Sequence, residues 1–452
     1  PGSGVPALLQ PLLAANGLRP PNADSPAWFV LRVLLLSVGL PYFLLSTTST
    51  LLQFWYGRIY RARQHYRFYI WSTSASLAAL LSYPLFIEPG FAIRAQAWIW
   101  TVGFVGFLVA LGFCMWASGR AFGGESGAGE AGETSLGERA PGIRLHAAWI
   151  FLASLGSVLL LAGTNELTQD VASVPFLWVL PLSLYLLTFM LGFSTRWRLP
   201  VWLLVMLNLA CLGAAIWTQF QSGLLDTWVQ VTVNSAVIFF GCLLCHSEVY
   251  RLRPAPAHLT GFYLMISAGG ALGGALVNLA APVIFNGYWE YHIGLAFVAL
   301  TAVAILYRRK LLRWWWLRIP VTVIGLAIGV FLMVFPVYLQ RSSLLTARNF
   351  YGVIRVRQAF VDGVATYRMV HGTTLHGLQA IDPAYAGQPT TYYTEKSGVG
   401  MAIETLPKRI QFQPVRVGII GLGEGTLAAY GDLGDVFRFY ELDPEVIRLA
   451  QD

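Results

Sequence analysis

The chain has 452 residues, of which 56% are hydrophobic and only 12% are charged. Soluble domains carry about 25% charged residues, so this composition excludes an ordinary soluble protein and indicates a membrane protein. The net charge of +8 does not predict nucleic-acid binding, because the basic residues lie in short loops between apolar runs and not on one binding face.

Ten apolar runs follow a short non-membrane segment at residues 1–26. Each run is long enough, or nearly so, to cross a bilayer core, which takes about 20 helical residues. We therefore predict a polytopic α-helical transmembrane domain over residues 27–341, interrupted by a flexible loop at 118–144 that is rich in Gly, Glu and Ser. The predicted membrane helices cover residues 27–46, 67–87, 95–117, 146–164, 174–194, 200–218, 228–249, 258–282, 290–307 and 318–339.

Basic residues are distributed unevenly between the loops at the two ends of these helices. Sixteen of them lie in alternate loops, whereas the opposite loops contain only Arg94. Because loops rich in Arg and Lys stay in the cytoplasm, we predict that the basic loops are cytoplasmic and that the chain after residue 341 lies on the other side. The sixteen are Arg58, Arg61, Arg63, Arg67, Arg120, Arg139, Arg144, Arg196, Arg198, Arg251, Arg253, Arg308, Arg309, Lys310, Arg313 and Arg318.

Small and polar residues inside the apolar runs predict contacts between helices. Gly269, Gly270, Gly273 and Gly274 form two overlapping Gly-x-x-x-Gly patterns, which allow helices to approach closely. The partner helix can belong to the same chain or to another subunit of a membrane complex; lipid is the other expected neighbour. Amides within the spans predict interhelical hydrogen bonds in preference to a transport path; they belong to Asn208, Asn234 and Asn278.

Two motifs raise the question of haem or metal binding. Cys242, Cys245 and His246 have the spacing of a c-type haem attachment site. They end an apolar helix on the side predicted to be cytoplasmic, so helix packing is the favoured interpretation. His371 and His376 lie in a turn-rich segment without the further ligands that a zinc site needs. We interpret them as turn or substrate-facing residues and predict no metal site.

Beyond residue 341 the composition changes to that of an α/β domain. In residues 342–411, Val, Ile, Tyr and Phe alternate with Asp-Gly and His-Gly pairs, which predicts strands and hairpins. In residues 412–452, VRVGII predicts a parallel strand, GLGEG a tight turn, TLAAYGD the start of a helix and VFRFYELD a second strand. This order is typical of the start of a Rossmann-type nucleotide-binding domain.

The glycines of this turn have a physical role in nucleotide binding. Gly421 and Gly423 would let the backbone approach a ligand, and Gly425 would let the helix pack on the strand. Glu441 follows Gly421 by 20 residues, where a carboxylate can accept hydrogen bonds from ribose hydroxyls. The alternative is a Gly-rich turn that binds nothing.

Several segments resemble the bacterial membrane-bound spermidine synthase-like proteins, also described as fused transporter-like/spermidine synthase proteins. They are SVGLPYFLLSTTST, CHSEVYRLRPAPAHLTGFYLMISAGGALGG, RNFYGV, HGTTLHGLQ, PTTYY and GLGEGTLAAYGD, and they span nearly the whole chain. In addition, Glu441, Asp443 and Pro444 match the Glu-x-Asp-Pro that ends the second strand in spermidine synthases. The resemblance implies a multi-pass protein of the bacterial inner membrane. It also implies aminopropyl transfer from decarboxylated S-adenosylmethionine to a polyamine, or related chemistry with S-adenosylmethionine itself.

The resemblance assigns roles to individual residues. It implies nucleoside-binding residues at Gly421, Gly423, Gly425, Glu441 and Asp443. On the substrate side it implies roles for Gln379, Tyr393 and Glu395, although Thr394 stands where the family has an amide or an imidazole. The paired acids that precede the tyrosine in the family are not seen in QPTTYY.

The resemblance further implies helices before Pro1 and strands after Asp452. The catalytic aspartate of spermidine synthases lies on one of those later strands, so no catalytic residue is assigned. We expect this chain to bind S-adenosyl compounds weakly or not at all. Two other functions stay open: a non-catalytic scaffold or accessory subunit of a larger membrane complex, and a polyamine transporter.

Overall fold

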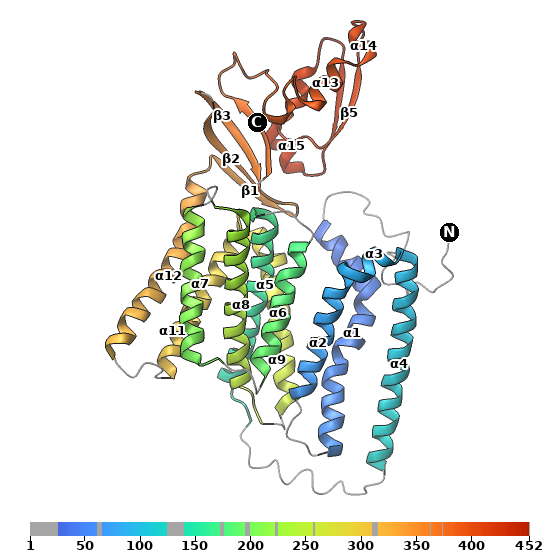
Figure 1. The fold of residues 1–452 in the computed structure, drawn as a ribbon, viewed down its shortest axis with the longest axis vertical. Helices are drawn as coiled ribbons and strands as arrows, with labels where there is room; N and C mark the ends of the chain where they lie inside the picture. Colours follow the sequence, from blue (N-terminus) through green and yellow to red (C-terminus); the bar gives the residue numbers. More distant parts are fainter. Residues whose placement is uncertain are drawn as a thin grey trace.

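The computed structural model describes residues 26–60, 66–123, 140–171, 176–194, 199–221, 225–255, 258–309, 315–361, 363–372 and 374–451. A bundle of long helices supports a smaller unit with two β-sheets at one end (Figure 1). The predicted segment 1–26, except for Pro26, and most of the predicted loop 118–144 lie outside the described residues. The same holds for Arg61, Arg63, Arg139, Arg196, Arg198, Lys310 and Arg313.

All ten predicted membrane segments coincide with helices of the bundle. These are α1 (Pro26–Tyr60), α2 (Tyr66–Ser82), α4 (Ile93–Gly123), α5 (Ile143–Asn165), α6 (Phe176–Phe193), α7 (Val201–Phe220), α8 (Thr227–Arg251), α9 (Leu259–Ala275), α11 (Trp289–Arg308) and α12 (Trp315–Arg341). Within the described residues, nine helices are long and apolar enough to cross a membrane, and the apolar part of α6 is shorter. The prediction of membrane-protein character is therefore supported, with nine such helices where ten were expected.

Short irregular segments extend three of these helices at the end that faces the sheets. They are η2 (Tyr83–Ile87) and α3 (Glu88–Gly90) after α2, η3 (Glu166–Val171) after α5, and η5 (Leu276–Ala280) and α10 (Ala281–Ile284) after α9. In η2, η3 and η5 the backbone forms the wider π-helical turn, which frequently occurs at functional sites.

The helices from α5 onward bury two apolar clusters, and α5, α6 and α8 contribute to both, whereas few side chains of α1, α2 and α4 are buried. The most buried core side chains include Leu159, Ile238 and Leu295, which come from α5, α8 and α11. In the apolar stretches of α5 and α11, 50% and 67% of residues are buried, against 6% in α1 and 11% in α4. Figure 1 shows α1, α2 and α4 as a separate group beside the core helices. The outer helices thus present apolar side chains of the kind that lipid solvates.

The glycine-rich helix α9 packs closely on α5. A Cβ atom on Gly269 would come within 2.5 Å of the Ile150 carbonyl oxygen, and one on Gly273 within 2.5 Å of the Ser154 carbonyl oxygen. Gly270 and Gly274 are less constrained: their nearest neighbours would lie at 3.5 and 3.8 Å. The predicted close helix contact is therefore present, and its partner is a helix of the same chain.

The helices alternate in direction, so the loops predicted to be basic and the opposite loops lie at different ends of the bundle. The ends of α1, α4, α8 and α11 and the starts of α5 and α12, where the basic residues cluster, lie far from the sheets (Figure 1). The end of α12 leads directly into the first strand, at the opposite end of the bundle. The arrangement in space matches the predicted alternation of loops.

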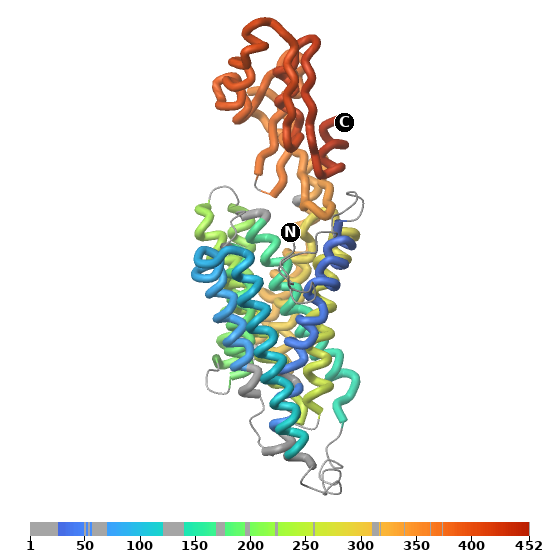
Figure 2. The backbone as a smooth tube through the Cα atoms, turned by 90° about the vertical axis from the view of Figure 1, so that its right-hand side faces the viewer, coloured from blue at the N-terminus to red at the C-terminus, as the bar shows by residue number. Residues whose placement is uncertain are grey.

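The C-terminal unit begins with an antiparallel sheet. Its strands β1 (Leu345–Asn349), β2 (Gly352–Val361), β3 (Val364–His371) and β4 (Thr374–Ala380) are adjacent in chain order. Short elements follow: η6 (Thr391–Tyr393), α13 (Gly398–Glu404) and α14 (Pro407–Ile410). The strand and hairpin prediction for this region is confirmed, and Figure 2 shows the unit standing on the bundle end.

The last part of the chain forms a two-stranded parallel sheet. Strands β5 (Arg416–Ile420) and β6 (Val436–Tyr440) pair in register, from Arg416 opposite Val436 to Ile420 opposite Tyr440. The connection contains η7 (Thr426–Tyr430), a 3₁₀ segment where the sequence predicted an α-helix start, and α15 (Pro444–Gln451) follows β6. Only five residues separate Gly425 from Gly431, which leaves too little chain for an α-helix of ordinary length. The described strands thus give a β–turn–β unit and not a Rossmann sheet.

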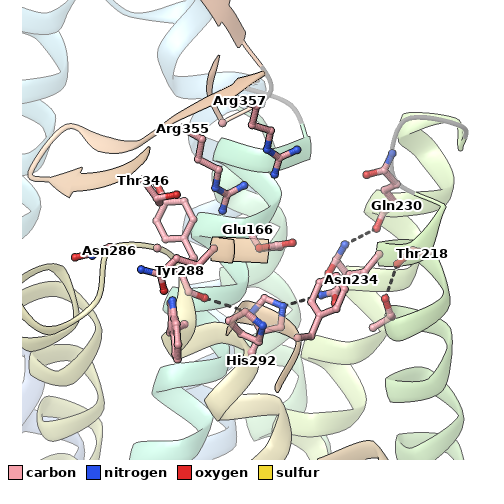
Figure 3. Close-up of a pocket in the computed structure, with 18 residues that line it drawn as sticks. Glu166, Thr218, Gln230, Asn234, Asn286, Tyr288, His292, Thr346, Arg355 and Arg357 are labelled. Carbon is pink, nitrogen blue, oxygen red and sulfur yellow. Dashed lines mark hydrogen bonds between the residues drawn. The ribbon is translucent and has the colours of Figure 1, made fainter. Parts of the chain in front are cut away.

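The two faces of β2 meet different parts of the molecule. Ile354 packs with Met369 and Val446 in a small apolar core that joins the antiparallel sheet to α15. Arg355 and Arg357 alternate with these positions, so they point to the opposite face of the sheet. That face lies over the end of the helix bundle (Figure 3).

Candidate functional site

The glycine turn after β5 has a backbone that requires glycine. Gly421, Gly423 and Gly425 have φ angles of 92°, 58° and 75°. A side chain at any of them would be strained, because L-residues avoid this region of φ. The Gly421 N–H donates to the Tyr440 carbonyl at 2.9 Å, which fixes the turn to the end of β6.

Glu441, directly after β6, holds this turn through its carboxylate. One oxygen, Oε2, accepts from the Leu422 N–H at 2.8 Å. The other, Oε1, accepts from the N–H groups of Leu442 and Asp443 at 2.7 and 2.9 Å. Burial alone would raise the pKa of Glu441, but these three N–H groups and the nearby His376 together hold it below its ordinary value. Glu441 is therefore an oriented carboxylate beside the glycine turn, as the sequence predicted.

His376 on β4 lies close to Glu441 and to a second histidine. The rings of His371 and His376 are 5.6 Å apart between centroids. Burial lowers the pKa of His376, the neighbouring His371 lowers it further, and Glu441 opposes the shift. His371 itself covers Gly352, whose added Cβ would meet the ring at 2.2 Å. The two histidines thus have different surroundings: His371 packs at the β1–β2 turn, and His376 lies near enough to Glu441 for the carboxylate to influence its pKa.

Glu424, the acidic residue inside the turn, fastens the turn to the antiparallel sheet. Its Oε1 accepts from the Met369 N–H at 2.7 Å, and its Oε2 is buried without a hydrogen-bond partner. Burial raises the pKa of Glu424 to about 7, although the Met369 N–H opposes this. The side chain occupies the space beside Gly377, where an added Cβ would come within 2.7 Å of Oε2. This role of Glu424 was not predicted from the sequence, because it depends on the contact between the turn and β3.

Asp443 lies below the turn and joins three elements. Its side chain is buried, and Oδ1 accepts from Asn349 Nδ2 at 2.5 Å and from the Glu445 N–H at 2.9 Å. Asn349 belongs to the turn between β1 and β2, where it also accepts from the Tyr351 N–H at 2.8 Å. The structure thus places Asp443 between the RNFYGV segment and the start of α15.

The three residues expected on the substrate side lie around β4 and η7. Gln379 is exposed on β4, opposite Tyr367 of β3. The Tyr393 carbonyl accepts from the Tyr430 hydroxyl at 2.5 Å, and burial, with a hydrogen bond to Tyr392, raises the pKa of Tyr393 to about 12. Burial raises the pKa of Tyr430, and the carboxylates of Glu395, which is exposed, and Glu404 raise it further. Tyr393 and Glu395 are therefore both near Tyr430 of η7. Gln379 lies apart from them on β4, the edge strand of the sheet.

A second site, which the sequence analysis missed, lies where the bundle meets the antiparallel sheet. A cavity of about 270 Å³ opens there between the ends of α7, α8, α11 and α12 and the strands β1 and β2. Arg355 and Arg357 reach into it from the sheet, Glu166 from the end of α5, and Asn234 and His292 from the bundle (Figure 3). We call this space the junction cavity.

Polar contacts organise the floor of the junction cavity. The Tyr291 hydroxyl donates to Asn234 Oδ1 at 2.5 Å, and Asn234 Nδ2 donates to the Gln230 carbonyl at 2.9 Å. Gln219 Nε2 lies 3.1 Å from His292 Nε2, and His292 Nδ1 lies 3.4 Å from the Tyr288 carbonyl. The interhelical hydrogen bond predicted for Asn234 is thus confirmed, between α8 and α11.

A buried ion pair joins the sheet to the bundle beside this cavity. Arg348 of β1 donates to both carboxylate oxygens of Glu290 at 2.9 and 2.7 Å, and to the Gly287 carbonyl at 2.6 Å. The two side chains are only 4% and 7% exposed. The guanidinium also lies 4.8 Å from the ring centroid of Tyr288. This contact fixes β1, and with it β2, over the end of α11.

The cysteines and histidine that match the haem spacing are part of helix packing. Cys242, Cys245 and His246 are at most 1% exposed. His246 stacks on Phe189 with ring centroids 3.6 Å apart, and its Nδ1 lies 3.0 Å from Thr188 Oγ1. Among the residues that the structure describes, no three His, Cys, Asp or Glu side chains are placed to hold a metal ion.

Comparison with known proteins adds no relative to this description. No protein-family model, no curated protein and no solved structure matches the chain.

Proposed function

We propose that this chain is a membrane-bound spermidine synthase-like protein whose glycine turn binds the nucleoside of an S-adenosyl compound. The observation that carries the proposal is the position of Glu441: its carboxylate lies at the glycine turn, at the end of the strand parallel to β5, where it accepts from the Leu422 N–H. In nucleotide-binding turns an acid at this place accepts hydrogen bonds from ribose hydroxyls.

The Glu441 carboxylate can accept a further hydrogen bond from a ligand, in addition to its three bonds from backbone N–H groups. An ionised carboxylate offers about four acceptor positions, and three N–H groups use three of them. The contacts orient the group, so a ribose hydroxyl can bind without reorganising it. Because Glu441 has one acceptor position left and Glu424 is committed to the antiparallel sheet, we expect the binding to be weak.

The resemblance gives the chemical class of the reaction. In aminopropyl transfer the nitrogen of a polyamine attacks the carbon bound to the sulfonium. The new C–N bond forms as the C–S bond breaks, the electron pair leaves with the neutral thioether, and the amine gives its proton to a base. Positioning and proton removal account for catalysis of this kind. We assign Glu441 and Gly423 to nucleoside binding and assign the base to no described residue.

Photo-crosslinking tests this proposal. The full chain in detergent, irradiated with radiolabelled S-adenosylmethionine, should incorporate label into peptides that contain residues 416–441. Glu441→Gln should remove most of the label. The matched control is Glu445→Gln, since Glu445 pairs with Arg448 on α15 and lies outside the turn. Equal labelling of the three proteins would count against the proposal, provided that all three have the same unfolding temperature.

A non-catalytic scaffold is the second candidate, and one observation favours it. Glu424 ties the glycine turn to the Met369 N–H of β3, so the turn has a structural role whether or not it binds a ligand. In this case the C-terminal unit would offer its surface to another protein of a membrane complex. Absence of label from the wild-type chain would favour this candidate.

The orientation that we propose places the C-terminal unit outside the cytoplasm of a bacterium, on the inner membrane. Support comes from the basic residues: the helix ends that carry them lie at the end of the bundle opposite the sheets. Retention of basic loops in the cytoplasm would then leave the glycine turn and the junction cavity on the other side.

A further inference from the structure

We propose that the junction cavity binds a small hydroxylated monocarboxylate, with its carboxylate between Arg355 and Arg357 and its hydroxyls on the amide-lined floor. This inference does not depend on the nucleoside site, because no residue of the glycine turn lines the cavity.

The size and lining of the cavity fit a small polar solute. A volume of 270 Å³ corresponds to about nine water molecules at about 30 Å³ each. Most of the lining side chains that can form hydrogen bonds are neutral amides and hydroxyls. They are Thr218, Gln219, Gln230, Asn234, Asn286, Tyr288, Gln340 and Thr346. An acyl chain would leave Gln219 Oε1 and Thr346 Oγ1 buried without a hydrogen-bond partner, whereas a ligand with several hydroxyls would satisfy them.

The two arginines provide the anion-binding part of the cavity. Arg355 and Arg357 are two residues apart on β2, and both side chains point down into the cavity (Figure 3). Arg357 Nε lies 3.3 Å from Ser343 Oγ. Within the described part of the chain, no hydrogen bond or ion pair engages the half-buried Arg355 guanidinium. A carboxylate would give it the planar, two-oxygen partner that arginine binds best.

One side chain on the floor and one on β1 require hydrogen-bond donors from the ligand. Gln219 Oε1 and Thr346 Oγ1 are buried and have no hydrogen-bond partner. Since Gln219 Nε2 is a donor, His292 Nε2 must accept from it, which leaves the His292 proton on Nδ1 toward the Tyr288 carbonyl. His292 is therefore neutral in this network, and Gln219 Oε1 is free to accept from a ligand hydroxyl.

The charge balance selects a monoanion. Arg355 and Arg357 contribute two positive charges and Glu166 one negative charge, so the lining carries 2 − 1 = +1 when His292 is neutral. One carboxylate neutralises this charge. A polyamine would add positive charge to a cavity that is already positive, which is unfavourable in a partly buried site.

Calorimetric titration of the full chain in nanodiscs tests the assignment. Sodium gluconate is the probe, and sorbitol is the matched neutral polyol, in which a CH2OH group replaces the carboxylate. We expect gluconate to bind and sorbitol not to bind. Arg355→Gln should weaken gluconate binding about tenfold or more, because a charge-assisted contact is lost. Arg368→Gln is the control: Arg368 is exposed on the neighbouring strand and does not line the cavity.

A second variant keeps the test decisive if Arg355→Gln does not fold. Thr346→Val retains the shape of the side chain and removes the unpartnered hydroxyl, so it should weaken gluconate binding several-fold. Equal binding of sorbitol and gluconate would overturn the proposal. So would binding of inorganic phosphate or spermidine in place of gluconate, or unchanged gluconate binding in both cavity variants. None of these outcomes involves S-adenosylmethionine, so the two proposals can fail separately.

Discussion

Arg348 of β1 and Glu290 at the start of α11 form a bidentate ion pair with N–O distances of 2.9 and 2.7 Å. This ion pair attaches the C-terminal unit to the helix bundle. Both side chains are almost fully buried. Because Asn349, the next residue, binds Asp443, the same turn joins the bundle to the glycine-turn region. The relative position of the two candidate sites therefore depends on this short segment.

Breaking the ion pair between Arg348 and Glu290 should lower the free energy of unfolding. Arg348→Ala would leave the Glu290 carboxylate buried without its counter-ion, and removal of one partner of a buried pair destabilises by about 3–5 kcal/mol. Denaturant unfolding in detergent measures this loss. Arg448→Ala breaks the more exposed pair with Glu445 and should change stability by less than about 1 kcal/mol. Similar losses in the two variants would contradict the role that we give to Arg348.

Because α9 packs closely on α5, we expect Gly→Ala substitutions at neighbouring glycines of α9 to change the stability of the protein by different amounts. Gly273→Ala should destabilise by about 1–3 kcal/mol, because overpacking forces backbones apart, and the new Cβ would meet Ser154 O at 2.5 Å. Gly270→Ala should be neutral or slightly stabilising, since its new Cβ would meet only Ser157 Oγ at 3.5 Å. Thermal unfolding in detergent compares them. A Gly270 variant less stable than the Gly273 variant would show that the helix face is wrongly placed.

We expect the attachment of the glycine turn to β3 through Glu424 to depend on pH. The pKa of about 7 in the folded protein lies above the ordinary value of 4.5. Between these values the folded state binds more protons than the unfolded state, so this contribution to stability is complete below about pH 4.5 and is lost as the pH rises through 7. Hydrogen exchange of the Met369 amide should therefore accelerate between pH 5 and pH 8 beyond the intrinsic chemical trend.

Glu424→Gln keeps an oxygen for the Met369 N–H and removes the titration. The variant should follow the intrinsic trend alone over the same range. Glu395→Gln is a suitable control, because Glu395 is exposed. Identical profiles for the wild type and Glu424→Gln would show that another group governs the exposure of this amide.

Cysteine labelling tests the orientation in the membrane. Ser342 is exposed between α12 and β1. In intact cells, a membrane-impermeant thiol reagent should label Ser342→Cys from the periplasmic side once the outer membrane is permeabilised. The wild-type chain measures the background from its native cysteines. Protection until the inner membrane is lysed would place the C-terminal unit in the cytoplasm.

The sequence predicted the helices well because each depends on local composition. In lipid, the backbone N–H and C=O groups of a run of about 20 apolar residues must form hydrogen bonds with each other, and a helix achieves this. The Gly-x-x-x-Gly patterns of α9 are also local, and they predicted that another helix packs closely against these glycines. Hydropathy could not identify α5 as that partner, since the choice depends on how all the helices pack together.

The glycine turn and Glu441 were also accessible from the sequence, because their spacing follows from one β–turn–β unit. The junction cavity was not. Gln219 and His292 lie on different helices 73 residues apart, and Arg355 belongs to a strand. Alternation along β2 shows that Arg355 and Arg357 share a face, but only the docking through Arg348 and Glu290 determines that this face covers the bundle.

Saturation-transfer NMR with S-adenosylmethionine is the most direct test of the nucleoside site, because it detects the weak binding that we expect. The full chain in deuterated detergent should transfer magnetisation to the ribose and adenine protons of the ligand, and Glu441→Gln should abolish the transfer while Glu445→Gln preserves it. Transfer of equal strength with Glu441→Gln, at an unchanged unfolding temperature, would show that the nucleoside does not bind at the glycine turn.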